Sequence, residues 1–378
     1  MGPTIRMKGV CHMTQTVRER LSAPVSERAL ETILGATLAL WTFGEILFEH
    51  STFAQALWCV ANRPVQYVQA LVVGCLVAVL ASKRFRLGVR DVALMFPLLF
   101  FALLVWGKSR DPHTLVLALF AVCVQGIDLR RLARAYATGA MVALVAALAL
   151  TGWVYSLDPS FSLRNVVFGR YVFGYPGALS CLLFSIVSAA CLFVRVRKAR
   201  VGLAVLCVAF AALSAAPLHA KRCGVLFLLL AALIVADVLR GEALARVARR
   251  DLTLWVVAVL PAVLFCLVGD MRTLYGAGFE LGAYANMTMV WGLGFSAAAA
   301  LLFARAVLSW RGRDVDPVMI GIICFFSFLL VFEQQPMNLE FNVTLLMLAQ
   351  GFARIECLPE DMSEPGVGEV YDGSEKGR

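Results

Sequence analysis

The feature that most constrains this chain is a series of long apolar runs that recurs along nearly its whole length. A helix that crosses a bilayer needs about 20 mostly apolar residues, because hydrocarbon offers no partner to an unpaired backbone amide or carbonyl. Ten runs meet this requirement clearly: 29–48, 65–82, 91–107, 135–154, 176–194, 201–218, 225–239, 252–269, 286–308 and 318–333. Two further runs, 114–127 and 341–353, are shorter. The chain is therefore predicted to be an all-α polytopic membrane protein with about twelve transmembrane helices.

Composition excludes the main alternatives to a membrane protein. Of the 378 residues, 61% are hydrophobic and 16% are charged, whereas soluble domains average about 45–50% and about 25%. A soluble globular enzyme, a disordered chain, a collagen and a coiled coil are all excluded on this ground. In so apolar a chain the net charge of +9 indicates orientation in a membrane, and no nucleic-acid partner is expected.

The distribution of basic residues predicts the orientation of the helices. Of the 34 lysines and arginines, 26 fall in the two tails and in alternate connections, at 83–90, 130–134, 195–200, 240–250 and 305–313. The opposite side carries only eight: Arg63, Lys108, Arg110, Arg164, Arg170, Lys221, Arg222 and Arg272. By the positive-inside rule both termini are cytoplasmic, which requires an even number of crossings and favours twelve over ten.

Three segments follow from this layout. Residues 1–28 form a basic cytoplasmic tail in which no cleavable signal peptide is expected. Residues 29–353 form the transmembrane domain, and residues 354–378, acidic and interspersed with Pro and Gly, form a cytoplasmic tail predicted to be disordered. Seven of the eleven cysteines lie inside apolar runs and no C-x-x-C pair occurs, so the cysteines are expected to pack as small apolar side chains.

Two long outer connections, at 155–175 and 270–285, carry candidate functional residues. The first contains Arg164 and Arg170, which either bind a ligand or extend to lipid headgroups. The second region contains glycines that allow a loop to close over a ligand, and it can equally be a solvated connection. Its candidate residues are Arg272, Tyr275, Glu280, Tyr284 and Asn286.

Two shorter polar segments lie next to apolar runs. The turn HAKRCG at 219–224 places His219, Lys221 and Arg222 at helix ends, where cations are costly unless they are paired or face a polar cavity. A histidine at such an edge is either a hydrogen-bonded interface residue or a base. The segment EQQPMNLEFN at 333–342, which includes Glu340, indicates a polar cavity because lipid does not accommodate so many polar groups.

No motif of a soluble enzyme is present: the chain lacks a P-loop, H-E-x-x-H, G-x-S-x-G and a dinucleotide-binding fingerprint. His12, His50 and His113 share no spacing typical of a metal site. The sequence therefore predicts no metal and no other cofactor.

Three stretches give the chain a resemblance to a known family. They are RYVFGYPGALS at 170–180, AKRCGVLFLLLAAL at 220–233 and ANMTMVWGLGFSAAAALLF at 285–303. In these the chain resembles bacterial O-antigen polymerases of the Wzy type and O-antigen ligases, over about residues 160–352. The ligases carry a histidine where this chain has Ala285, which favours a polymerase. The polymerases often have Asn where this chain has Gly177.

The resemblance implies a GT-C-like membrane glycosyltransferase in the bacterial inner membrane. Its substrates are oligosaccharide repeat units on undecaprenyl pyrophosphate, which it joins into O-antigen, capsule or exopolysaccharide at the periplasmic face. A chain-length regulator is a possible partner, besides membrane lipids. The expected base is Glu280, with His219 and Glu340 as alternatives. The residues expected to bind pyrophosphate or glycan are Arg164, Arg170, Lys221, Arg222, Arg272, Tyr275, Tyr284 and Asn286.

Three alternative functions stay open at this point. An O-antigen ligase would transfer the finished glycan to the lipid A core. A twelve-span secondary transporter would show matching halves and ionisable groups within broken helices near the midplane, and the sequence shows only scattered acids such as Glu31 and Glu45 within its first apolar run. A structural scaffold would leave the outer cations unexplained.

Overall fold

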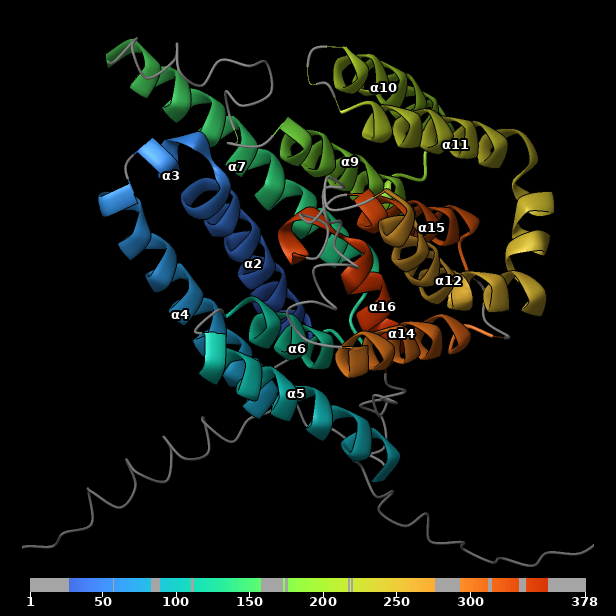
Figure 1. Cartoon of the computed structure of the whole chain (residues 1–378), viewed down its shortest axis with the longest axis horizontal. Coiled ribbons are helices and arrows are strands. Elements are labelled where there is room, and N and C mark those ends of the chain that lie inside the picture. Colours follow the sequence, from blue (N-terminus) through green and yellow to red (C-terminus); the bar gives the residue numbers. More distant parts are fainter. Residues whose placement is uncertain are drawn as a thin grey trace, which may run out of the picture.

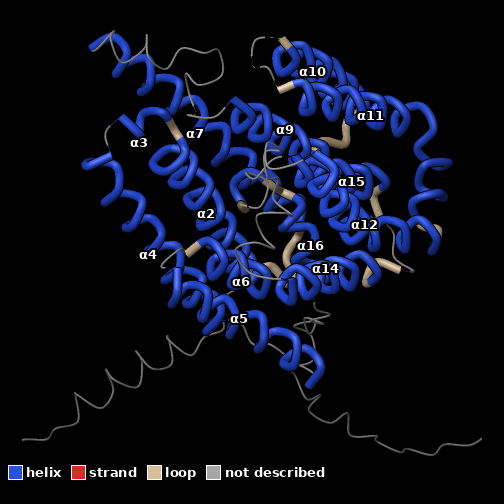
Figure 2. The backbone as a smooth tube through the Cα atoms, in the orientation of Figure 1, coloured by secondary structure: helices blue, strands red, loops and turns tan. Residues whose placement is uncertain are grey.

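The computed structural model describes residues 27–56, 58–82, 89–109, 112–157, 173, 176–216, 218, 220–275, 293–311, 315–332 and 338–352. Every extended regular element within these ranges is a helix (Figure 2), and the β-type pairing found there is one isolated bridge between Ser51 and Phe173. The predicted all-α class is confirmed. The tails at 1–26 and 353–378 lie outside the described residues.

The described chain forms a series of helices (Figure 1), and these helices coincide with the apolar runs of the sequence. The N-terminal half contains α2 (Glu27–Glu45), a π-helical turn η1 (Ile46–His50), α3 (Thr52–Ala56), α4 (Trp58–Ser82), α5 (Val89–Ser109), α6 (His113–Cys123) and α7 (Leu129–Leu157). The C-terminal half contains α9 (Pro176–Phe193), α10 (Arg197–Ala215), α11 (Lys221–Ala248), α12 (Asp251–Tyr275), α14 (Leu293–Leu308), α15 (Pro317–Phe332), a 3₁₀ turn η3 (Leu339–Phe341) and α16 (Thr344–Phe352).

Each of the twelve predicted runs lies largely within one of these helices. Among the described residues, five helices are long and apolar enough to cross a membrane, at Arg28–His50, Pro64–Ser82, Leu129–Val154, Arg197–Ala215 and Lys221–Ala248. The described residues also contain shorter apolar helices, at Met95–Lys108, His113–Cys123, Gly177–Phe193, Asp251–Leu264 and Pro317–Leu330. The protein is thus a multi-pass α-helical membrane protein, while the number of crossings stays a prediction.

Some helices extend beyond the runs that predicted them. The connection expected at 270–285 is helical as far as Tyr275, because α12 contains no glycine or proline between Asp270 and Gly276 that would end it. The connection expected at 155–175 likewise begins later, since α7 continues to Leu157. These segments were predicted as loops because their polar residues end the apolar runs, but a polar residue by itself does not end a helix.

The core of the N-terminal half is the contact between α2 and α7, which lie side by side in Figure 1. Leu34, Leu38 and Trp41 of α2 are fully buried. Gly139 of α7 sits directly against the backbone of Ala39, so that an added Cβ would lie 2.6 Å from the Ala39 carbonyl oxygen. This close contact fixes the position of α2 against α7 shortly before the last turn of α2, where its polar residues begin.

The C-terminal half is arranged around α9, α11 and α15, and α10 and α11 form a hairpin beside α9 (Figure 1). The ring of Phe184 in α9 lies 5.2 Å from the rings of both Phe227 in α11 and Phe326 in α15, measured between centroids. Cys181 in α9 and Cys223 in α11 are buried, and their sulfur atoms lie 4.0 Å apart, in agreement with a packing role.

Large apolar side chains remain exposed along the outward faces of several helices. Examples are Phe96 and Leu103 on α5, Val205 on α10, and Trp255 and Val256 on α12. Contiguous apolar surface of this kind is unfavourable in water and expected against lipid tails. The outward faces of these helices are therefore the lipid-facing surface.

Candidate functional site

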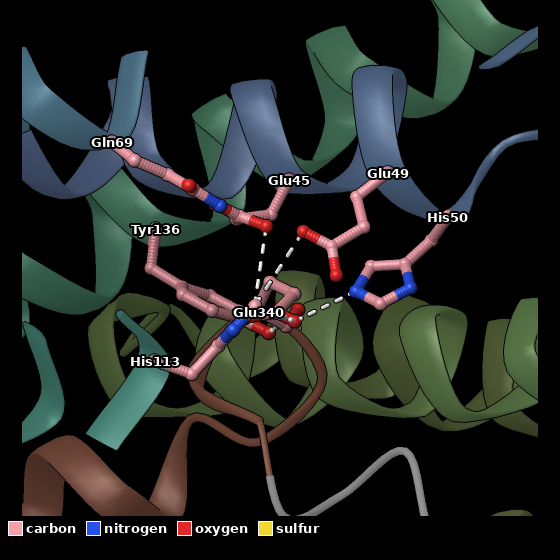
Figure 3. A network of polar contacts seen from close by, with 7 residues as sticks. All are labelled: Glu45, Glu49, His50, Gln69, His113, Tyr136 and Glu340. Atoms are coloured by element: carbon pink, nitrogen blue, oxygen red, sulfur yellow. Dashed lines mark hydrogen bonds and ion pairs between the residues drawn. The ribbon is translucent and has the colours of Figure 1, made fainter. Parts of the chain in front are cut away.

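A cluster of ionisable side chains lies where the C-terminal end of α2 meets η1, the start of α6 and η3 (Figure 3). Glu45 ends α2, and Glu49 and His50 belong to η1. His113 begins α6, and Glu340 is the middle residue of η3. We call these five residues the Glu/His cluster. Figure 3 shows that Glu340 reaches it on a loop from the C-terminal end of the chain, so residues from three distant parts of the sequence meet there.

The closest contact in the Glu/His cluster joins Glu340 to His50. Nε2 of His50 lies 2.9 Å from Oε1 of Glu340, a hydrogen bond in which the imidazole donates and the carboxylate accepts. The Glu340 side chain is 0% exposed and that of His50 is 22% exposed. The ring of Phe341 stands edge-on to the His50 ring, with centroids 5.0 Å apart. The hydrogen bond to Glu340 and the ring contact with Phe341 together fix the orientation of the His50 imidazole.

The second contact joins His113 to the two acids of the α2–η1 segment. Nε2 of His113 lies 3.2 Å from Oε2 of Glu45 and 3.9 Å from Oε2 of Glu49, distances of ion pairs when the imidazole is protonated. Gln69 of α4 donates from Nε2 to the other oxygen of Glu45 at 3.0 Å. Trp41 stands edge-on to the His113 ring at 5.3 Å. Glu45 is thus held between α4 and α6.

Tyr136 and Ser185 anchor the backbone that carries Glu340. The Tyr136 hydroxyl donates to the Glu340 carbonyl oxygen at 2.6 Å and lies 2.7 Å from the Ser185 hydroxyl. Ser185 in turn accepts from the backbone N–H of Val343 at 3.1 Å. The segment then enters α16 through Asn342, whose side-chain oxygen accepts from the N–H of Thr344 at 3.0 Å. The two helices α7 and α9 therefore position η3.

The electrostatics of the Glu/His cluster depend on its imidazoles. Three carboxylates face two histidines, and His113 Nε2 also lies 3.7 Å from Glu340 Oε1. Burial by itself raises the pKa of the Glu340 carboxyl, but the hydrogen bond from His50 and the charges of His113 and His50 hold that pKa below its usual range. An ionised Glu340 accepts a proton or binds a cation.

Two oxygens in the cluster have no hydrogen-bond donor among the residues that the structure describes. They are Oε2 of Glu45 and Oε2 of Glu340, both buried. Oε2 of Glu45 is close to His113 but lacks the alignment of a hydrogen bond. A buried carboxylate oxygen without a donor costs free energy, which makes these two atoms points where a ligand would bind.

Of the three predicted bases, only Glu340 lies within the described ranges; Glu280 and His219 lie outside them. Arg164, Arg170, Tyr284 and Asn286 also lie outside the described residues. Arg272 and Tyr275 belong to the last turn of α12. Lys221 and Arg222 are the first two residues of α11 and are exposed. Of the segment predicted to line a polar cavity, residues 333–337 lie outside the described ranges, and Glu340 is fully buried.

The sequence did not single out Glu49, His50 or His113, and it treated Glu45 as a scattered acid. One local signal was available: Glu45 and Glu49 are four residues apart, which places two acids on one helix face. Like charges at that spacing repel and need counter-charges nearby. His50 and His113 have no regular spacing because the fold, and not one helix, brings them together.

The chemistry of the Glu/His cluster follows from its own groups: carboxyl groups beside imidazoles, partly open to the surface at His50 and Glu49. Such a group can accept a proton from a hydroxyl, relay protons or bind a cation. Comparison of the chain with descriptions of protein families, with curated proteins and with solved structures gives no match.

Proposed function

We propose that the protein is a membrane glycosyltransferase that polymerises oligosaccharide repeat units carried on undecaprenyl pyrophosphate. The resemblance of three stretches to O-antigen polymerases suggests the reaction. The structural support for the proposal is the environment of Glu340. Its carboxylate is buried, hydrogen-bonded to His50 and held through its backbone by Tyr136. A carboxylate fixed in this way inside an apolar bundle is suited to general-base catalysis.

In the proposed reaction a hydroxyl of one repeat unit attacks the anomeric carbon of a glycan held on a second carrier. Glu340 accepts the hydroxyl proton as the new glycosidic bond forms. The bond from the anomeric carbon to the pyrophosphate breaks, and undecaprenyl pyrophosphate leaves with the bonding electrons. His50 and His113, beside Glu340, keep the carboxylate ionised before the attack. Glu340 thus takes the role for which Glu280 and His219 are the alternatives.

The leaving group carries several negative charges and is stabilised by cations without needing a protonated acid. Lys221 and Arg222 project from the exposed start of α11. In the proposal they act together with Arg164, Arg170 and Arg272, whose guanidinium groups form paired hydrogen bonds to phosphate oxygens. Tyr275, Tyr284 and Asn286 contact the sugars.

The test is Glu340→Gln, which preserves size and removes basicity. Polymerisation is expected to fall by about 10²-fold or more, because general-base catalysis contributes about 10²–10⁴-fold. The measurement is the ladder of glycan lengths on gels, at protein levels matched by blotting. Glu31→Gln is the matched control: Glu31 is a carboxylate of the same helix bundle that pairs with Arg131 outside the cluster, so its ladder is expected to stay normal.

The phenotype of a deletion strain separates polymerase from ligase. A polymerase mutant is expected to attach single repeat units to its acceptor without ladders, whereas a ligase mutant attaches none. Normal ladders in the deletion strain, or in Glu340→Gln at matched expression, would contradict the assignment of this reaction or of this base, respectively.

A secondary transporter is the second candidate, and one observation favours it. The Glu/His cluster places buried ionisable groups between helices, and transporters use such groups to couple substrate movement to protons or ions. Reconstitution into proteoliposomes distinguishes the two functions. Solute flux without glycan lengthening would support the transporter, and lengthening of a lipid-linked glycan without flux supports the polymerase.

A further inference from the structure

We propose that Glu45, Glu49, His50 and His113 bind one divalent transition-metal ion. Each of the four offers a ligand atom, and these atoms all lie within 4.8 Å of one another. Atoms coordinated to one such ion at about 2.0–2.2 Å are necessarily within about 4.4 Å of one another, so small side-chain movements suffice to close the site. The inference does not depend on the proposed glycosyl transfer.

The two buried oxygens without hydrogen-bond donors are an independent indication of a ligand. Oε2 of Glu45 belongs to a residue of the proposed ligand set, and Oε2 of Glu340 belongs to a carboxyl group whose Oε1 lies 3.7 Å from His113 Nε2. Both side chains are 0% exposed. Away from water, an ionised oxygen is stabilised by a donor or by a cation. Neither oxygen forms a well-aligned hydrogen bond with the described residues, although Nε2 of His113 lies 3.2 Å from Oε2 of Glu45. A metal ion at the centre of the cluster supplies the missing positive charge.

The ionisable groups of the cluster are compatible with a divalent ion. The cluster brings three carboxyl groups together with two imidazoles. Histidine binds metals through a neutral imidazole and carboxyl groups bind them as carboxylates, so the ligand set suits a cation.

The ligand types indicate the class of metal. Two imidazoles and two carboxylates suit Zn²⁺, Fe²⁺ or Mn²⁺, whereas Ca²⁺ and Mg²⁺ are bound mainly by oxygen. The neighbours of the ligands also fit. Glu340 accepts a hydrogen bond from His50, and Gln69 donates to the second oxygen of Glu45; partners of this kind orient metal-binding side chains. Glu49 is 37% exposed, which provides an entry path for the ion.

The experiment uses the full-length protein purified in detergent, stripped with a chelator and dialysed against Zn²⁺ or Co²⁺. Zinc content is measured by mass spectrometry, and cobalt coordination by its visible absorption bands. The wild-type protein is expected to retain about one equivalent of Zn²⁺ and to show the absorption of Co²⁺ with nitrogen and oxygen ligands. Both readouts are independent of any enzymatic activity.

Two variants remove single ligands while keeping polar side chains: Glu45→Gln and His113→Gln. Each is expected to weaken Co²⁺ binding by more than about 100-fold, whereas Gln69→Ala, which removes only a supporting hydrogen bond, weakens it by about 10–100-fold. Glu31→Gln is the matched control and retains wild-type affinity, because Glu31 pairs with Arg131 away from the cluster. Size-exclusion profiles verify that the variants are folded.

Two results would overturn the proposal. One is a wild-type protein that retains no Zn²⁺ after dialysis and shows no Co²⁺ absorption bands, a measurement for which no variant has to fold. The other is metal binding that is equally strong in wild type, Glu45→Gln and His113→Gln, which would locate the ion elsewhere. Loss of polymerisation in Glu340→Gln with intact metal binding separates this inference from the proposed function.

Discussion

At the scale of single residues, Tyr136 connects the helical bundle to the candidate site. Its hydroxyl is fully buried, donates to the Glu340 carbonyl oxygen and contacts Ser185, which also holds Val343. A buried network of this kind fixes one conformation only when all its members are satisfied. Tyr136 therefore controls the position of Glu340 although it contacts only the backbone of that residue.

Tyr136→Phe removes the hydroxyl and keeps the ring. The expected result is a loss of about 1–3 kcal/mol of stability, because the Glu340 carbonyl is left without its buried partner. The measurement is the unfolding midpoint in detergent. Tyr67→Phe is the matched control: Tyr67 of α4 is 72% exposed, so the change is expected to stay within about 0.5 kcal/mol. Equal midpoints for the two variants would contradict a structural role for the Tyr136 hydroxyl.

At the scale of elements, the position of the cluster depends on how closely α2 approaches α7. The Cα of Ala39 and Oγ1 of Thr42 would both lie 2.7 Å from a Cβ at position 139. The Thr42 hydroxyl is itself bonded to the Leu38 carbonyl oxygen at 2.6 Å. Only a glycine fits at this contact, which lies about one helical turn before Glu45.

Gly139→Ala is expected to force α2 away from α7 and to lower stability by about 1–3 kcal/mol, as overpacking of a close contact does. Gly74→Ala is the matched control, since Gly74 lies in α4 with nothing within 4 Å of the added Cβ. That change is expected to be neutral or to stabilise by up to about 1 kcal/mol, because alanine favours helices. Thermal unfolding of both variants in one detergent measures the difference, and a tolerated Gly139→Ala would show that the helices are farther apart.

At the scale of the whole molecule, ion pairs connect segments that the charge distribution assigns to one side. Arg195 lies 2.7 Å from Asp316, and Arg311 donates from Nε to Asp251 at 2.9 Å. Arg200 pairs with Asp237, and Arg131 pairs with Glu31. All four arginines belong to the predicted cytoplasmic set, so the contacts agree with the assignment of these connections to a common face.

Reporter fusions test the orientation. Fusions after Arg86, Arg200 and Arg250 are expected to report a cytoplasmic location, and fusions after Ser162 and Gly278 a periplasmic one, because basic connections remain in the cytoplasm. Paired reporters that are active on opposite sides of the membrane provide the control at each site. A single inverted site would contradict the predicted number or order of crossings.

The sequence by itself determined the helical elements. Each apolar run must satisfy its own backbone hydrogen bonds in lipid, and this local requirement makes hydropathy sufficient to predict a helix. The ends were less predictable, as at residues 270–275, because a polar residue ends an apolar run without ending the helix. Glu340, Lys221 and Arg222 could be named as candidates from the sequence because polar groups next to apolar runs stand out in it.

Only the tertiary structure decided which polar groups meet. His50 and Glu340 are 290 residues apart in sequence and 2.9 Å apart in space. No periodicity encodes that contact, since it results from how α2, α6, α7 and η3 pack. The same packing brings His113 to Glu45. Helix formation follows from hydropathy along one segment, whereas a site assembled from several segments follows from side-chain packing between them, which a single sequence does not display.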